Sequence, residues 1–198
     1  MTVYVQKLRF HPYKIFVYGL IAGLTFMFLS LSVSFLYANF QFQYPDLKLP
    51  VVIHINTLII IFSSISLWYA EKKLNNEDIL RLRNAVGITF GLGVCFIFLQ
   101  YSGLSILTEA GLGLRGSQSG SYFYLISGLH VFHVLIGLVF LLGALAQSNA
   151  CVKNDVKALV FLTDPVKKMS FKLMAFYWHF VGLLWIYLYI IFILATIV

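Results

Sequence analysis

Charged residues are scarce in this 198-residue chain: Asp, Glu, Lys and Arg together make up 11% of it, whereas hydrophobic residues make up 61%. An ordinary soluble domain carries roughly 25% charged residues. A soluble fold of this size could not remove so much apolar surface from water, and the composition therefore excludes that class. Lipid must be the solvent for much of the chain, which indicates an integral membrane protein.

Segments of about ten residues that alternate between apolar and polar side chains, the pattern of a membrane β-barrel, are also missing. Instead, the chain holds five charge-free runs of 20 or more residues. A helix that rises 1.5 Å per residue crosses about 30 Å of hydrocarbon with about 20 residues. The sequence predicts an all-α bundle of five transmembrane helices in one membrane domain, 1–198, with spans at 15–38, 51–70, 85–106, 120–147 and 173–198.

Cysteine is nearly absent, with two residues in the whole chain. Cys95 lies inside the third predicted span and Cys151 in a predicted cytoplasmic loop, so a disulfide is not expected. The longest connection, 148–172, is too short for a folded module. We expect it to be a loop with one surface helical turn at the headgroup boundary.

The basic residues are distributed unevenly between the two sides of the predicted bundle. The N-terminal segment and the second and fourth connections carry 12 of the 14 Lys and Arg, leaving Lys48 and Arg115 on the other side. Basic residues of short loops stay in the cytoplasm, so the N-terminus is predicted to be cytoplasmic and the C-terminus periplasmic. Because the cations are spread over three loops, nucleic acid is not expected as a partner.

The predicted spans contain no Asp, Glu, Lys or Arg, which disfavours an ion-coupled transporter, because such proteins keep ionisable residues in the membrane. The polar residues that remain in the predicted spans carry no formal charge. Asn56 and Ser63 share one face of the second span, with Ser66 nearby. Small and hydroxyl residues let transmembrane helices approach closely. We therefore expect helix packing from these residues and from the glycine pairs Gly19 and Gly23, and Gly87 and Gly91.

Four histidines lie within the predicted spans. His130 is about ten residues, or roughly 15 Å, from the outer end of its span and so near the midplane. A neutral imidazole at that depth must form a hydrogen bond, so His130 and His133 should face protein. His179 lies near the cytoplasmic end of the last span and His54 near the outer end of the second.

A haem or metal site is the functional alternative for these histidines. A bis-histidine haem needs ligands on two helices at similar depth, and His133 with His179, the one plausible pair, is mismatched by about one turn. A zinc or copper site needs more ligands, but Cys95 is the only thiol within a predicted span and no carboxylate is close. Interhelical hydrogen bonding is the favoured interpretation.

The last span is rich in aromatic residues. Tyr177, Trp178 and His179 follow Lys172 closely, which predicts that they belong to the aromatic belt at headgroup level. The other aromatic residues of this span, Trp185 among them, are expected to pack against helices or to contact lipid or a partner subunit.

Four of the five predicted spans carry distinctive motifs, which lie at 49–66, at Gln100, at 127–137 and at 177–189. Together these motifs resemble those of subunit III of haem-copper respiratory oxidases. SGLHVFHVLIG at 127–137 resembles the histidine helix of that family, and YWHFVGLLWIYLY at 177–189 resembles its last helix. The stretch 49–66 is similar to its helix with Pro, Asn-Thr and Ser-Ser, and Gln100 to the Gln that ends the next span. The five spans resemble the bacterial form of the family.

The resemblance implies a noncatalytic subunit without catalytic residues, cofactor or metal of its own. Haem and copper would be held by a catalytic subunit I, the expected partner together with other oxidase subunits and membrane lipids. The family is thought to hold phospholipid and to sustain proton uptake, here in a bacterial plasma membrane. The residues expected to serve helix packing or lipid and partner contact are His54, Asn56, Ser63, His130, His133, Gly137, Trp178, His179 and Trp185.

Two positions depart from the family pattern. Gly182 stands where the family commonly has an acidic residue, and the first span has serines at 30, 32 and 34 where the family often has a buried Glu. Roles of those carboxylates are not carried over to this chain. The alternatives are the related small subunit of a nitric oxide reductase and a haem-binding membrane anchor.

Overall fold

The computed structural model describes residues 12–42, 49–109 and 118–197. These residues form six helices and no strand: α1 Pro12–Phe42, α2 Val51–Asn75, α3 Ile79–Glu109, α4 Gln118–Val152, α5 Asp155–Thr163 and α6 Pro165–Ile197. All of them except α5 are long and apolar enough to cross a membrane. The predicted all-α architecture with five membrane-spanning helices is therefore confirmed. Lys48 and Arg115 lie outside the described residues.

The helices continue beyond the charge-free runs from which they were predicted. The second predicted span ends at residue 70, but α2 continues through Glu71 to Asn75. Likewise the third predicted span begins at residue 85, whereas α3 begins at Ile79. Long charged side chains reach the headgroup region from a helix that is still intact, so a charge does not end a helix at the membrane boundary.

The connection between the fourth and fifth predicted spans is mostly helical, which corrects the predicted loop. The α4 helix runs to Val152, the nine-residue α5 follows, and Pro165 begins α6. The Asn154 side chain accepts hydrogen bonds from the backbone N–H groups of Val156 and Lys157 at 3.0 and 3.3 Å, which caps the start of α5. Proline suits the first turn of a helix, where its missing N–H has no partner to lose.

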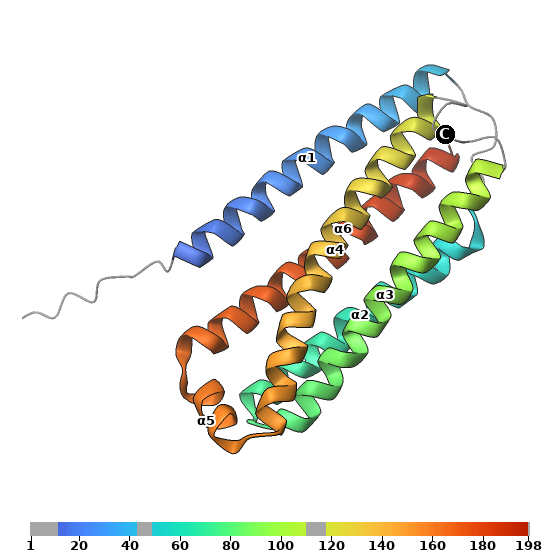
Figure 1. The fold of residues 1–198 in the computed structure, drawn as a ribbon. Coiled ribbons are helices and arrows are strands. Elements are labelled where there is room, and N and C mark those ends of the chain that lie inside the picture. The colour runs from blue at the N-terminus through green and yellow to red at the C-terminus, as the bar shows by residue number, and fades with distance from the viewer. Residues whose placement is uncertain (1–11, 43–48, 110–117, 198) are drawn as a thin grey trace, which may run out of the picture.

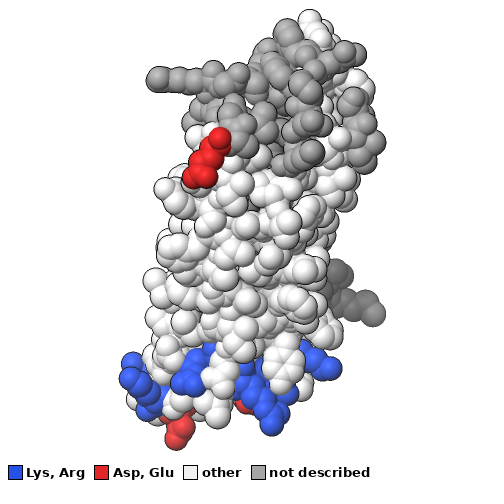
Figure 2. Space-filling model, turned by 90° about the vertical axis from the view of Figure 1, so that its right-hand side faces the viewer, with Lys and Arg blue, Asp and Glu red and all other residues white. Residues whose placement is uncertain are grey.

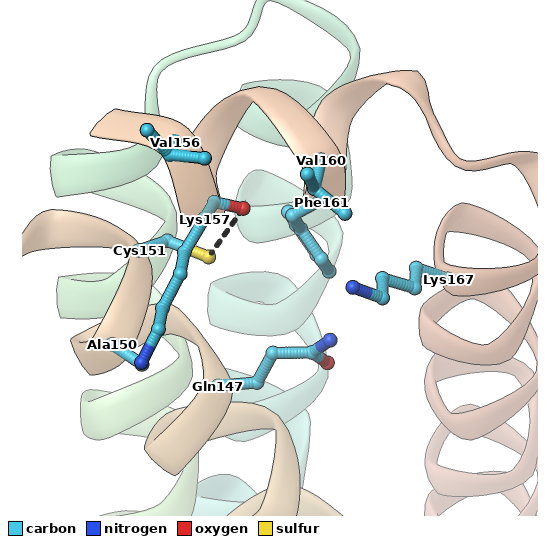
Figure 3. Close-up of a pocket in the computed structure, with 8 residues that line it drawn as sticks. All are labelled: Gln147, Ala150, Cys151, Val156, Lys157, Val160, Phe161 and Lys167. Carbon is cyan, nitrogen blue, oxygen red and sulfur yellow. Dashed lines mark hydrogen bonds between the residues drawn. The ribbon is translucent and has the colours of Figure 1, made fainter. Parts of the chain in front are cut away.

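Cys151 consequently belongs to the last turn of α4 and not to a loop. Its Sγ lies 3.6 Å from the carbonyl oxygen of Lys157 in α5. Figure 3 shows this corner, where Cys151, Phe161 and Lys167 border a cavity of about 260 Å³. The short helix α5 thus folds back against the end of α4.

The long helices pack as a bundle with α4 and α6 at its centre (Figure 1). The antiparallel pair α2 and α3 shares the largest interface, α4 lies beside α3, and α6 contacts α1, α2 and α4. The α1 helix lies over α4 and α6, with Phe28 and Phe35 buried beneath it. Many of its other large apolar side chains point outward, as a lipid environment or a partner helix allows.

The described Lys and Arg side chains form a band at one end of the bundle on the face drawn in Figure 2. This end is where α2 stops, α3 begins and α4, α5 and α6 meet. The sequence pattern predicts such a grouping. The cytoplasmic assignment of this end remains a prediction.

Candidate functional site

Two buried tryptophans of α6 join it to α2. The indole Nε1 of Trp178 donates a hydrogen bond to Ser63 Oγ at 3.0 Å, and that of Trp185 donates to Thr57 Oγ1 at 3.1 Å. Trp178 and Trp185 are seven residues apart, or about 10 Å along one face of the helix. A buried indole N–H needs an acceptor, and hydroxyl groups supply it between transmembrane helices.

The ring of Trp178 fits between glycines of two other helices. A Cβ on Gly93 of α3 would lie 2.7 Å from Trp178 Cη2, and one on Gly137 of α4 would lie 2.8 Å from Trp178 Cε3. Neither position can hold a side chain unless the tryptophan moves. Trp178 is only 1% exposed and Tyr177 4%. Their predicted place in the aromatic belt is therefore wrong, because the glycines open a site for the indole inside the bundle.

His130 is fully buried among aromatic rings. Its ring centroid lies 5.0 Å from that of Trp185, 5.8 Å from that of Phe96 and 6.4 Å from that of Phe28. Within the described part of the chain, neither imidazole nitrogen has a hydrogen-bond partner. The predicted interhelical hydrogen bond of this histidine is therefore not found there, and ring packing joins α1, α3, α4 and α6 instead.

His133 takes part in helix contact through its backbone as well as its ring. Its Nδ1 lies 2.7 Å from the carbonyl oxygen of Leu129 in its own helix. Its carbonyl oxygen accepts a hydrogen bond from the hydroxyl of Tyr177 in α6 at 3.1 Å. The imidazole packs edge-on against Phe28 of α1. The polar contact between α4 and α6 is therefore made by the backbone, not by the imidazole.

Polar contacts also join α2 to its other neighbours. Asn56 Nδ2 donates to Gln100 Oε1 of α3 at 2.8 Å, and both residues are buried. Nearer the end of the bundle opposite the band of Lys and Arg, His54 Nδ1 lies 2.6 Å from the hydroxyl of Tyr189 in α6. Of these residues, the sequence indicates Gln100 only through a motif, and no local signal marks Tyr189 as the partner of His54.

A carboxylate approaches His179, contrary to the sequence interpretation. Glu71 Oε2 of α2 lies 3.5 Å from His179 Nε2, and both side chains are a little over one quarter exposed. The sequence interpretation ended the second span before Glu71 and so missed this pair. Within the described ranges, no three His, Cys, Asp or Glu side chains come together as a metal site.

Most of the predicted glycine packing is also wrong. A Cβ on Gly19, Gly23 or Gly91 would meet no described atom within 4 Å, and one on Gly87 would lie 3.7 Å from Leu145 Cδ1. Spacing puts two glycines on one face but does not say whether another helix lies there. Among the described glycines, the closest approaches occur at Gly93 and Gly137 instead.

The fold and these contacts define the class as a multi-pass helical membrane protein in which the motif residues of several helices meet in the bundle interior. Residues 20–196 match the family model described as cytochrome c oxidase subunit III. The chain belongs to the cytochrome c oxidase subunit III family.

Curated relatives with the name cytochrome c oxidase subunit 3 agree with this assignment. The protein from Sus scrofa is 32% identical over 136 residues, which cover 69% of this chain and 47% of the relative. The Bos taurus protein is also 32% identical over 136 residues, with the same coverage of this chain and of the relative. The Thermostichus vulcanus protein is 30% identical over 143 residues, covering 72% of this chain and 65% of the relative. The chain thus spans about half the length of the two mammalian relatives.

Proposed function

We propose that the chain is the noncatalytic subunit III of a haem-copper terminal oxidase in aerobic respiration. It packs against the catalytic subunit, which holds haem and copper, and supports the stability, lipid binding and proton uptake of that subunit. The proposal extends the family membership to activity and partners, and the name of the relatives, cytochrome c oxidase subunit 3, supports the oxidase assignment.

One observation carries the structural part of the proposal: motif residues of α2 and α4 converge on Trp178 and Trp185 of α6. Ser63 and Thr57 accept hydrogen bonds from the indoles, and Gly137 lies against Trp178. His130 stacks on Trp185. These side chains are engaged with one another, so they hold the helices in place and leave the redox chemistry to the partner.

The membrane assignment rests on the length of the helices, on the distribution of basic residues and on one of the relatives. Five helices can cross a membrane, and the described cations lie at one end of the bundle. Basic residues favour the cytoplasmic side. The relative from the cyanobacterium Thermostichus vulcanus supports a bacterial setting. We therefore assign the chain to a bacterial plasma membrane, with its Lys-rich end in the cytoplasm.

Removal of the chain tests its accessory role. Membranes with and without it are compared for haem absorption and for oxygen consumption over many turnovers. Membranes that lack the chain should keep the haem spectrum and the initial rate of oxygen consumption but lose activity faster. If haem absorption disappears together with the chain while the catalytic subunit is still present, the chain itself is a haem anchor. If the affected activity is nitric oxide reduction, the nitric oxide reductase alternative holds instead.

A further inference from the structure

Two buried serines differ from other serines of the bundle in what their hydroxyl groups contact. The serines at 30, 34, 102, 148 and 170 each donate a hydrogen bond to the carbonyl oxygen four residues earlier in their own helix. Ser32 of α1 and Ser127 of α4 are at most 1% exposed, yet neither hydroxyl has a hydrogen-bond partner among the described residues. Because a polar group buried without a partner is costly, above all in hydrocarbon, both hydroxyl groups need another partner.

A cluster of rings lies on one side of these two serines. The first ring cluster joins four helices and consists of Phe28, Phe96, His130 and Trp185. Ser32 follows Phe28 by one turn of α1, and Ser127 precedes His130 by about one turn of α4. The two helices run in opposite directions (Figure 1), so both serines lie on the side of the first ring cluster that faces away from the Lys-rich end.

A second ring cluster lies on the other side of the serines. Phe35 of α1 and Phe123 of α4 both pack against Phe192 of α6, with ring centroids 5.7 and 4.3 Å apart. Phe35 and Phe123 are each seven residues, or about 10 Å, from the first ring cluster along their helices. The rings on both sides hold α1 and α4 apart, and a serine is too short to fill the space between them. A layer of small polar side chains is thus enclosed between two layers of rings.

Other helices add unpaired polar atoms at the same depth. Gln100 of α3 follows Phe96 by one turn, and its Nε2 is buried without a partner in the described part of the chain. Its Oε1 accepts a hydrogen bond from Asn56 Nδ2, whereas Asn56 Oδ1 is also unpaired there. Both nitrogens of the His130 imidazole are in the same state. The layer therefore offers donors and acceptors together and no formal charge, which suits a small neutral molecule that can both donate and accept.

We propose that this polar layer binds ordered water in the interior of the bundle. The water bridges Ser32 of α1 and Ser127 of α4, and Gln100 Nε2 and the His130 imidazole supply further partners. A buried water typically makes about three hydrogen bonds to polar groups that have no other partner, as this layer allows. The bound water joins α1 to α4 near the middle of the membrane. The inference goes beyond the proposed function and does not depend on it.

The test is an electron cryomicroscopy map of the tagged chain in its native assembly, at a resolution that shows ordered water. We expect a density peak within hydrogen-bond distance of both Ser32 Oγ and Ser127 Oγ. Ser127→Val removes one hydroxyl and fills the space, so the peak should be lost. If Ser127→Val does not assemble, Ser32→Ala replaces it, because that change adds no bulk and should weaken the peak.

Ser148→Val is the matched control. Ser148 is equally buried in the same helix, but its hydroxyl already donates to the carbonyl oxygen of Ala144 at 2.7 Å. This variant should keep the peak between Ser32 and Ser127. A loss of the peak in the control as well would show that it depends on the general packing of α4 and would overturn the inference.

Three further results would overturn the inference. The first is a wild-type map that shows ordered water elsewhere in the assembly but no peak in this layer. The second is a direct hydrogen bond of the two serines to each other or to the carbonyl oxygens of Phe28 and Phe123. The third is a peak that is unchanged in Ser127→Val. The same maps show whether a catalytic subunit is present, so the proposed function is judged separately from the water.

Discussion

Trp178 of α6 occupies the space that Gly137 of α4 leaves open: a Cβ on Gly137 would lie 2.8 Å from Trp178 Cε3. The same ring also lies against Gly93 of α3, where it leaves no room for a side chain. Its N–H donates a hydrogen bond to Ser63 Oγ of α2. One indole therefore joins four helices, and it explains why small and hydroxyl residues are needed at these positions.

Gly137→Ala should destabilise the folded chain by roughly 1–3 kcal/mol, because the added methyl group overpacks a filled interior. The matched control is Gly143→Ala, at an open position on the same helix. Thermal unfolding of both variants in the same detergent, followed by tryptophan fluorescence, measures the effect. If the two variants unfold at the same temperature, Trp178 is not held as described.

The hydrogen bond between Trp178 and Ser63 should appear as a coupling energy. In a double-mutant cycle with Trp178→Phe and Ser63→Ala, we expect a coupling of about 0.6 kcal/mol, and at most about 1.7, as found between transmembrane helices. Unfolding of the four proteins in a detergent titration gives the value. A coupling of zero would mean that the indole N–H binds another acceptor.

His130 should tolerate an aromatic replacement. Its imidazole packs on Trp185 and Phe96, and no described residue hydrogen-bonds to its nitrogens. His130→Phe should therefore cost less than about 1.5 kcal/mol. His130→Ala should cost about 2–5 kcal/mol, because it leaves a cavity. Measuring the free energy of unfolding of both variants tests this expectation. An equal loss of stability in the two variants would show that the imidazole nitrogens form a polar contact essential to stability.

The pair formed by Glu71 and His179 should contribute little to stability. Both side chains are partly exposed, and exposed ion pairs are worth about 0–1 kcal/mol. Glu71→Gln should thus change the free energy of unfolding by less than about 1 kcal/mol, close to the effect of Glu77→Gln at an exposed position after α2. A much larger loss for Glu71→Gln alone would show that the pair is a structural requirement.

Composition was enough to predict five spans, because lipid demands about 20 apolar residues per helix whatever their order. The helix ends were not predictable in the same way. Glu71 ends a charge-free run, yet α2 continues to Asn75 and brings that carboxylate to His179. The capping side chain of Asn154, which starts α5, was a local signal that the sequence interpretation overlooked.

The interior of the bundle depends on residues that are distant in sequence. Trp178 follows Lys172 closely and so resembles a belt residue, but its burial is decided by Gly93 and Gly137 on other helices. Spacing equally suggested Gly19 and Gly23 as packing positions, although no described helix lies against them. The resemblance of motifs singled out His130 and Trp185, but only the structure shows that their rings stack.

Affinity purification of the tagged chain from its native membranes in mild detergent tests most directly whether it is a subunit of an oxidase. Mass spectrometry identifies the proteins that copurify, and a visible spectrum is recorded on the same sample. We expect that a large histidine-rich subunit copurifies and carries the haem absorption, and that the preparation reduces oxygen. A chain that is purified alone and itself absorbs in the Soret region would contradict its role as the noncatalytic subunit of an oxidase.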